Sequence, residues 1–280
     1  MFFSERDVRS EVQILACKLH VSKNKTGLTN NMPTKSRGDI LVIIPTYNEA
    51  ENVAIVIPRV LSSCPECEIL IVDDNSPDGT SRIVEGIANK EPKVHLLSRK
   101  DKGGLGTAYV AGFKYAIENG YDYVMEMDAD LSHEPSAIPN FRQALMNHAD
   151  VAVGSRYAFG VSVLNWPMRR LLLSYGANIF ARVVTGVPVN DMTSGFKAFK
   201  IDVLKSINLN SIRSNGYAFQ VEMNARVYRK GYKIVEVPIV FAERRVGTSK
   251  MSKKIVFEGV KIVLILGIGR VLKSLRLRNS

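Results

Sequence analysis

The chain has 280 residues, 46% of them hydrophobic, which is enough to bury one full-sized core. Its formal net charge of +11 at pH 7 favours an anionic partner: nucleic acid, a phosphorylated small molecule or an anionic membrane surface. Three cysteines are too few for a disulfide framework, and their odd number favours a reducing compartment. Cys64 and Cys67 have no second Cys or His pair at zinc spacing, so we expect no metal or redox role for them.

The N-terminal region is expected to be an appendage to this core. A short apolar periodicity in Val8, Val12, Leu15 and Leu19 predicts a helix, and the polar stretch after it predicts a linker. Charged residues occur where a secretory signal would have its apolar segment, so we expect no export. The predicted divisions are an N-terminal extension at 1–38, a main domain at 39–250 and a C-terminal apolar and basic segment at 251–280.

In the first half of the main domain, short runs of β-branched residues alternate with helical patterns. This alternation predicts an α/β fold with a mainly parallel sheet, in which ligands gather beyond the carboxyl ends of the strands. The predicted strands are 40–44, 68–73, 93–98, 122–127 and 150–154, and the predicted helices between them are 50–62, 79–89, 105–119 and 135–147. After residue 155 we expect helices near 169–185 and 217–230, a strand near 233–241 and a final apolar helix.

That final helix, 255–272, is apolar but is interrupted by Glu258, Lys261 and Arg270. Its uninterrupted apolar run is well short of the roughly 20 residues that span a bilayer. The basic residues that follow favour an interfacial helix or a docking segment for a membrane partner. A helix that packs on the core and carries a basic tail is the alternative.

Polar clusters end three of the predicted strands, at 45–49, 73–74 and 128–130. Asp128 and Asp130 are two positions apart, so on an extended backbone their side chains point to the same side. Such a pair can hold Mg²⁺ or Mn²⁺ together with water and phosphate oxygens. The alternative is a solvated strand end whose aspartates cap a helix.

The cluster at Asp73 and Asp74 favours a turn and a helix cap, yet two adjacent carboxylates also need a cation or hydrogen-bond donors beside them. Asp74 is a candidate acceptor for hydrogen bonds from a base or ribose. The glycine-rich stretch 102–106 lacks the G-x-G-x-x-G spacing, so a dinucleotide-binding fold is not expected. Arg156 and the basic stretch 244–250 suit phosphates, although a solvated basic loop is the alternative for the latter.

Taken together, these motifs resemble the dolichol-phosphate mannosyltransferases, which are inverting glycosyltransferases of the GT-A class. The resemblance follows the order of the chain over roughly residues 40–260. It rests on the segments 45–49, 73–80, 104–109, 128–133, 154–157, 176–178, 193–196, 216–223 and 244–250. The fold it implies is a GT-A domain with a mainly parallel central sheet and flanking helices.

The resemblance also implies roles for individual residues. The nucleoside would be held by Pro45, Tyr47, Glu49, Val72 and Asp74. The diphosphate and a Mg²⁺ or Mn²⁺ ion would be held by Asp128, Ala129 and Asp130, and the phosphates of donor or acceptor by Arg156, Arg244 and Lys250. Ser132 stands where some relatives place a Gln that binds the metal, and Tyr175 stands where relatives can carry a basic residue, so both positions depart from the pattern.

The implied reaction is transfer of mannose from GDP-mannose to dolichyl phosphate, giving dolichyl phosphate mannose for N-glycan, O-mannosyl and GPI-anchor assembly. A phosphate whose second pKa is about 6 is already a competent nucleophile, so we assign no general base, and Glu222 is a candidate for sugar contacts. The implied location is peripheral, on the cytosolic face of the endoplasmic reticulum membrane, with or without small membrane-anchored regulatory subunits. The nearest alternative is a dolichyl-phosphate glucosyltransferase that uses UDP-glucose. We do not expect nucleic-acid binding, because the acidic clusters would repel its phosphates.

Overall fold

The computed structural model describes residues 39–212, 214–242 and 253–278. Residues 37–280 form one compact unit, and residues 1–36 are a separate unit. The helix and linker predicted for the N-terminal extension lie outside the described residues, so only the larger unit is considered below.

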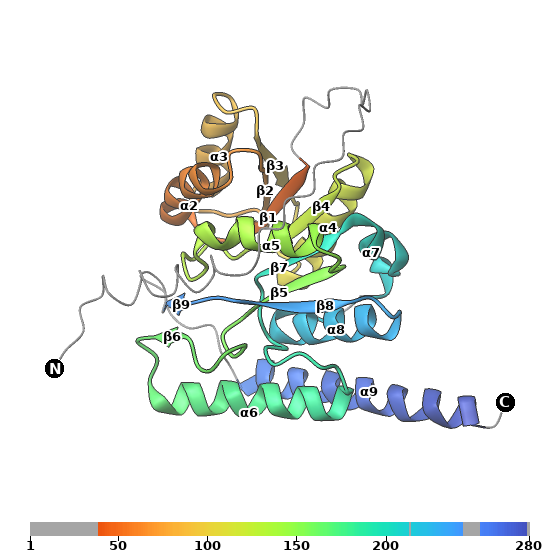
Figure 1. The fold of residues 1–280 in the computed structure, drawn as a ribbon. Coiled ribbons are helices and arrows are strands. Elements are labelled where there is room, and N and C mark those ends of the chain that lie inside the picture. Colours follow the sequence, from red (N-terminus) through yellow and green to blue (C-terminus); the bar gives the residue numbers. More distant parts are fainter. Residues whose placement is uncertain (1–38, 213, 243–252, 279–280) are drawn as a thin grey trace, which may run out of the picture. The chain divides into compact units, whose positions relative to one another are not determined.

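A seven-stranded sheet with the order β3-β2-β1-β4-β7-β5-β8 forms the centre of this unit (Figure 1). Its first four strands pair in parallel, β7 is antiparallel to both of its neighbours, and β8 is parallel to β5. The strands are β1 (Ile40–Thr46), β2 (Glu68–Asp73), β3 (Val94–Ser98), β4 (Tyr123–Glu126), β5 (Val151–Ser155), β7 (Lys197–Lys200) and β8 (Ile234–Pro238). A separate two-stranded sheet pairs β6 (Val163–Leu164) with β9 (Phe241–Ala242).

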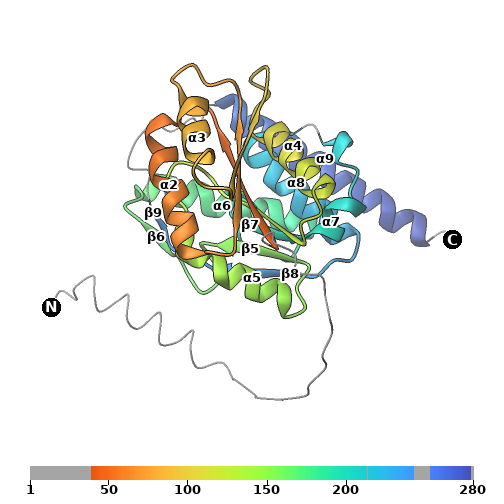
Figure 2. The ribbon, with the colours of Figure 1, turned by 90° about the horizontal axis from the view of Figure 1, so that it is seen from above.

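Helices cover both faces of the large sheet, as Figure 2 shows. One core cluster packs α4, α7 and α8 against the sheet, and the other packs α2, α3 and α5 against its opposite face. Strand β1 contributes to both, with Leu41 and Ile43 in the first and Ile40 and Val42 in the second, which is why it is apolar up to its last residue, Thr46. The helices are α2 (Ala50–Ser63), α3 (Thr80–Ala88), α4 (Leu105–Glu118), α5 (Ile138–Met146), α6 (Met168–Thr185), α7 (Ile201–Ser206), α8 (Gly216–Arg229) and α9 (Lys253–Arg278), with short 3₁₀ turns η1 (Pro135–Ala137) and η2 (Leu209–Ser211).

The predicted α/β fold with a mainly parallel sheet is confirmed: the five strands predicted before residue 155 are present, and the strand predicted near 233–241 is β8. Strand β7, which is inserted between β4 and β5, was not predicted. Its four residues begin and end with lysine and therefore show neither an apolar run nor an alternation. Lys197, the first of them, is nevertheless fully buried.

Helix α9 packs against α6 and α8, and its Val263 joins the core cluster on their side of the sheet. None of the described helices combines the length and the apolar character that crossing a membrane requires. Cys64 and Cys67, both buried, form a disulfide between the end of α2 and the start of β2. Counting cysteines in the sequence did not predict this bond.

Candidate active site

Three polar clusters meet at one edge of the sheet, as the strand ends predicted. Thr46, the last residue of β1, is the register partner of Asp73, the last residue of β2. On the other side of β1, Ile43 pairs with Glu126, so the Asp128–Asp130 segment follows the carboxyl end of the neighbouring strand β4. The parallel strands therefore bring the predicted nucleoside and metal residues to the same edge.

Asp73 organises the turn that follows β2. Its carboxylate accepts hydrogen bonds from the hydroxyls of Thr46 at 2.7 Å, Ser76 at 2.6 Å and Ser81 at 2.7 Å. Burial raises its pKa, but the hydrogen bonds from Ser76, Ser81 and Thr46 outweigh burial and lower the pKa below its usual value. Asp73 is therefore an ionised structural residue.

Asp74 holds the glycine-rich loop that precedes α4. Its Oδ1 accepts a hydrogen bond from Arg99 at 2.7 Å, and its Oδ2 accepts from the backbone N–H groups of Gly103 and Gly104 at 3.1 and 3.2 Å. The compensation predicted for the two adjacent carboxylates is thus supplied by hydrogen-bond donors. A bound nucleoside would share Asp74 with this loop, and the predicted nucleoside contact stays a prediction.

The other residues predicted to hold the nucleoside flank Asp74. The ammonium of Lys102 lies 3.5 Å from the centre of the half-buried Tyr47 ring. Glu49 accepts a hydrogen bond from the Asn52 side chain at 2.6 Å. Val72 is fully buried in the core, so its side chain is out of reach of a ligand and only its main chain can take part. Pro45 is the register partner of Val72 on β1.

The Asp128–Asp130 segment ends in a constrained turn at the edge of β4. Leu131 has a φ of +62°, a left-handed conformation that non-glycine residues rarely adopt, and the next N–H, that of Ser132, donates to Asp130 at 3.1 Å. The hydroxyl of Tyr109 lies 3.4 Å from Oδ1 of Asp128. Ala129 is buried between the two aspartates.

The donor atoms of this segment fit a hard divalent cation. Asp128 and Asp130 offer carboxylate oxygens, and the buried hydroxyl of Ser132 has no hydrogen-bond partner among the residues described. Within the described ranges, however, no group of three or more His, Cys, Asp or Glu side chains could hold a metal. A cation held here would therefore draw its remaining ligands from water and from substrate phosphate.

Arg156, predicted to bind phosphate, is buried and paired with Asp191. Its Nε and Nη2 donate to the two carboxylate oxygens of Asp191, each at 2.6 Å, and Nη2 also donates to Thr193 at 2.9 Å. Burial lowers the pKa of Arg156, but the charge of Asp191 outweighs it and raises the pKa. These bonds use Nε and Nη2, and Arg156 also lines the pocket described below.

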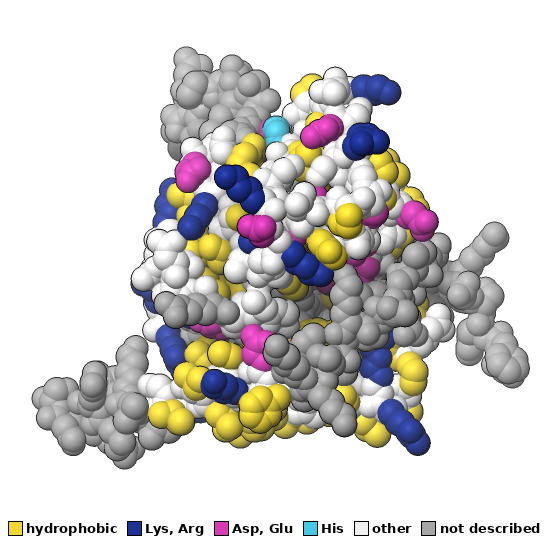
Figure 3. All heavy atoms as spheres, turned by 180° about the vertical axis from the view of Figure 1, so that it is seen from behind, with side chains coloured by type: hydrophobic (Ala, Val, Ile, Leu, Met, Phe, Trp, Pro, Cys, Tyr) yellow, Lys and Arg dark blue, Asp and Glu magenta, His cyan; other side chains and the backbone are white. Residues whose placement is uncertain are grey.

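Helices α6 and α9 both expose apolar side chains. On α6 one face exposes Met168, Leu172, Tyr175, Ile179 and Val183, which recur every three or four residues. Leu173 and Phe180, also exposed, line the pocket described below. On α9 the exposed positions are Phe257, Val260, Leu264, Ile265 and Ile268. Figure 3 shows hydrophobic side chains gathered along the lower edge of the molecule, where these helices lie in Figure 1, with Lys and Arg among them. We call these two sets the apolar face.

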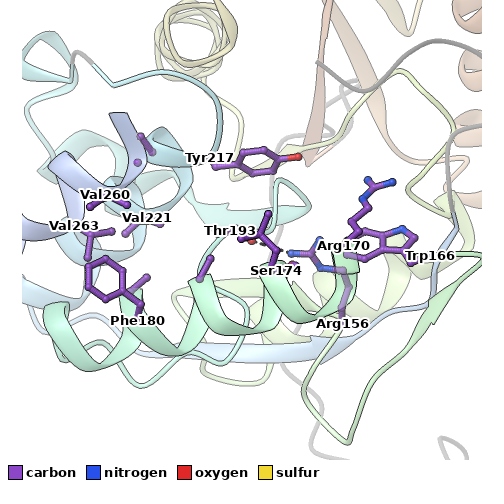
Figure 4. A pocket seen from close by; sticks show the side chains of 15 residues that line it. Arg156, Trp166, Arg170, Ser174, Phe180, Thr193, Tyr217, Val221, Val260 and Val263 are labelled. Carbon is purple, nitrogen blue, oxygen red and sulfur yellow. Dashed lines mark hydrogen bonds between the residues drawn. The ribbon is translucent and has the colours of Figure 1, made fainter. Parts of the chain in front are cut away.

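A pocket opens between α6, α8 and α9 (Figure 4). One end is polar or aromatic, and there the guanidinium of Arg170 stacks 4.1 Å from the ring centre of Trp166. The indole N–H of Trp166 is buried and has no hydrogen-bond partner among the described residues. The polar end is formed by Arg156, Trp166, Arg170, Ser174, Thr193 and Tyr217, and the apolar wall by Leu173, Ala177, Phe180, Ala181, Ala218, Val221, Val260 and Val263.

The sequence did not single out Trp166, Arg170 or Asp191. The one available signal was Trp166 followed by Arg169 and Arg170, at the start of the amphipathic helix α6. Glu222, a candidate for sugar contacts, is instead engaged by Arg226 at 2.7 Å and by Ser214. Arg244 and Lys250 lie outside the described residues.

A mainly parallel sheet with carboxylates at the ends of β2 and β4 is the arrangement of a glycosyltransferase of the GT-A fold, and the comparisons with known proteins assign the chain to that class. Glucosyl-3-phosphoglycerate synthase from Mycobacterium tuberculosis, in complex with Mn²⁺, UDP and glucosyl-3-phosphoglycerate, shares this fold with a TM-score of 0.61 and 18% identity, covering 84% of this chain and 81% of that one. Its complex with Mg²⁺ and UDP also has a TM-score of 0.61, with 17% identity over 82% and 79% of the two chains.

Residues 41–207 match the model of glycosyl transferase family 2, and the chain belongs to that family. It is 47% identical over 213 residues to polyprenol monophosphomannose synthase of Mycolicibacterium smegmatis, covering 76% of this chain and 80% of the relative. It is 44% identical over 239 residues to undecaprenyl-phosphate mannosyltransferase of Micrococcus luteus, covering 85% and 98%. The resemblance found in the motifs is thereby confirmed at the level of the family.

Proposed function

We propose that this chain transfers mannose from GDP-mannose to a polyprenyl phosphate, such as dolichyl phosphate, with inversion at the anomeric carbon. The observation that carries the proposal is the pocket between α6, α8 and α9, whose polar end and apolar wall match the two parts of a phosphorylated isoprenoid. The names of the two similar mannosyltransferases support the same acceptor class and the same sugar.

The polar end of the pocket suits the acceptor phosphate. Arg170 stacks on Trp166, and Arg156 keeps Nη1 outside its bonds to Asp191 and Thr193. These guanidinium groups would supply two positive charges and several donors for phosphate oxygens. The first isoprene units would lie along the apolar wall, where each buried methylene contributes about 0.8 kcal/mol.

The donor would occupy the neighbouring strand ends. Tyr47, Glu49 and Asp74 lie where β1 and β2 end, and they would bind the nucleoside. Asp128 and Asp130 would hold a Mg²⁺ or Mn²⁺ ion, with Ser132 directly or through water. When bound, this ion supplies positive charge that neutralises the departing diphosphate.

In the proposed reaction an acceptor phosphate oxygen bonds to the anomeric carbon of mannose, while the bond from that carbon to GDP breaks. The electron pair of the broken bond leaves with GDP. A dianionic phosphate needs no proton removed, so the task of the protein is positioning and charge stabilisation. Arg156 and Arg170 orient the attacking oxygen, and Arg244 and Lys250 are proposed to bind phosphates of either substrate.

The apolar face of α6 and α9 supports a peripheral position at a membrane surface. Exposed apolar side chains with Lys and Arg among them suit a helix lying in the interface. The proposed membrane is the one that carries the lipid acceptor. For dolichyl phosphate this is the cytosolic face of the endoplasmic reticulum, and small membrane-anchored subunits would then be candidate partners.

The test is transfer of labelled mannose from GDP-mannose by the purified full-length chain in detergent. Dolichyl phosphate and undecaprenyl phosphate are offered in parallel, each with Mg²⁺, Mn²⁺ or EDTA, and UDP-glucose replaces GDP-mannose in a further arm. Labelled lipid that forms with GDP-mannose and is lost with EDTA supports the proposal. Transfer from UDP-glucose alone refutes the proposed donor, and an EDTA-insensitive reaction refutes the proposed metal.

A further inference from the structure

Three polar side chains that the proposed mechanism does not use are buried together behind the Asp128–Asp130 segment. Glu126 on β4 and Lys197 on β7 are both fully inaccessible, and Gln220 on α8 is nearly so. Glu126 and Lys197 are register partners across the antiparallel β4–β7 pair. The ammonium of Lys197 donates to the main-chain oxygen of Gln220 at 3.0 Å and to its side-chain oxygen at 2.6 Å. Lys197 therefore connects two strands of the sheet with α8.

Stability alone is a weak explanation for these charges. Buried charges often stabilise a fold less than well-packed apolar residues of similar volume would, because desolvation opposes the attraction between them. Burial lowers the pKa of Lys197 to about 8, although the charge of Glu126 opposes this shift. The protonated form of Lys197 is therefore less stable in the core than in water. Both carboxylate oxygens of Glu126 and the amide nitrogen of Gln220 have no hydrogen-bond partner among the described residues.

The position of the cluster links the two halves of the proposed site. Glu126 lies two residues before Asp128, on the strand that leads into the proposed metal-binding segment. A Cβ atom built on Gly195 would lie 3.5 Å from the amide nitrogen of Gln220 and 3.6 Å from each carboxylate oxygen of Asp128. The Gln220 amide and the Asp128 carboxylate thus border the same glycine.

Helix α8 also forms the wall of the acceptor pocket. Tyr217 and Val221, on either side of Gln220 in the chain, line that pocket. The hydrogen bonds from Lys197 to Gln220 therefore attach the first turns of α8 to β7, which pairs directly with β4. A displacement of about 1 Å between an attacking atom and its target can lower a rate about a hundred-fold.

We propose that Lys197 is a positioning residue: through its hydrogen bonds to Gln220 on α8 and its pairing with Glu126 on β4, it holds the acceptor-binding helix α8 in place relative to the strand that leads into Asp128. This inference rests on the proposed function for its kinetic consequence. Its structural consequence, a fixed α8, is independent of the reaction.

The test replaces the charges rather than breaking the pair. Glu126→Leu combined with Lys197→Met removes both charges and keeps the volume, so the fold is expected to persist. Gln220→Met removes the side-chain acceptor of Lys197 and leaves both Lys197 and Glu126 in place. Lys205→Met, on the exposed end of α7, removes one lysine charge elsewhere and serves as the control.

Active sites are counted by GDP binding in the presence of Mn²⁺, and turnover is expressed per site. The double variant is expected to bind GDP within about two-fold of wild type and to lose at least about ten-fold in kcat, with Gln220→Met changed in the same direction. A purely structural role would lower the melting temperature and leave turnover per GDP-binding site unchanged. Wild-type kcat in the folded double variant overturns the proposal, and if that variant does not fold, Gln220→Met decides in the same way.

A second readout does not need activity. Trp166 is the single tryptophan of the chain and lines the same pocket as Tyr217 and Val221 of α8. A loosened α8 should raise the acrylamide quenching constant of its fluorescence about two-fold in the double variant and leave it unchanged in Lys205→Met. If the wild-type protein transfers no mannose, the proposed function fails but the quenching experiment can still be read. In that case, a quenching constant of the double variant that equals the wild-type value overturns this inference as well.

Discussion

Arg156 and Asp191 form a buried bidentate ion pair at the polar end of the pocket, with both hydrogen bonds at 2.6 Å. Three aromatic rings, those of Tyr157, Trp166 and Phe241, each have their centre 5.4 Å from the guanidinium carbon. A cation held in this way cannot turn toward solvent. Asp191 therefore determines the direction in which Arg156 presents its remaining N–H groups.

Asp191→Asn tests this relationship through stability. Removing the carboxylate charge leaves a buried guanidinium without compensation, which we expect to lower the free energy of unfolding by about 3 kcal/mol, as for other broken buried pairs. Urea denaturation of the two proteins measures the difference. Asp202→Asn is the matched control, because Asp202 is highly exposed and pairs only with Lys205 among the described ion pairs. Equal losses in both variants would contradict the structural role of the pair.

Asp130→Asn tests the proposed metal site. The substitution keeps the size of the side chain but removes the charge that binds a divalent cation, so we expect turnover to be abolished and the affinity for Mn²⁺, followed by electron paramagnetic resonance, to fall. Glu85→Gln, an exposed change on α3, should leave both quantities unchanged. A fully active Asp130→Asn protein would refute the metal assignment.

Arg244→Ala and Lys250→Ala test the basic stretch that the resemblance assigns to phosphates. Each is expected to lower kcat/KM at least ten-fold, which corresponds to about 1.4 kcal/mol of transition-state stabilisation. Steady-state kinetics at fixed ionic strength measures the loss. Lys233→Ala, a basic residue before β8 and away from the strand ends that form the site, is the control. Losses below two-fold in both variants would fit a solvated basic loop instead.

The sequence was sufficient for the parallel half of the sheet because each strand there is an apolar run that ends in turn-forming polar residues. The same polar residues at the strand ends placed Asp74, Asp128 and Asp130 at one edge of the sheet. It could not reveal the partners of these residues, since Gly103 and Arg99 meet Asp74 only after the crossover through β3 is formed. The side chains of α6, α8 and α9 that form the pocket are far apart in the sequence, and no local pattern links them.

The lowered pKa of Asp73 predicts how the free energy of unfolding depends on pH. Its pKa in the folded protein is lowered from about 3.9, the value expected in the unfolded chain, so ionisation stabilises the fold above that value. This contribution is fully present at neutral pH and is lost as the pH falls below about 4 toward the folded pKa. Asp73→Asn should therefore be less stable than wild type at pH 7, and the gap should narrow with acidification. Urea unfolding at pH 7, 5 and 3 measures it, and a gap that is constant with pH would contradict the assignment.

The apolar face of α6 predicts how the chain reaches its lipid acceptor. Leu172 and Ile179 are 63% and 48% exposed, so replacing either by Glu should leave the melting temperature unchanged. If these side chains enter the lipid interface, each change removes roughly 2 kcal/mol of transfer free energy, and binding to anionic vesicles should fall about 30-fold. Sedimentation with vesicles of phosphatidylserine and phosphatidylcholine measures the binding.

Ile55→Glu is the matched control for these two changes. Ile55 is 47% exposed on α2, far from α6 in Figure 1, so the same charge there should have little effect on vesicle binding. Equal losses in all three variants would reflect charge alone, and unchanged binding in Leu172→Glu and Ile179→Glu would place the membrane contact elsewhere on the molecule.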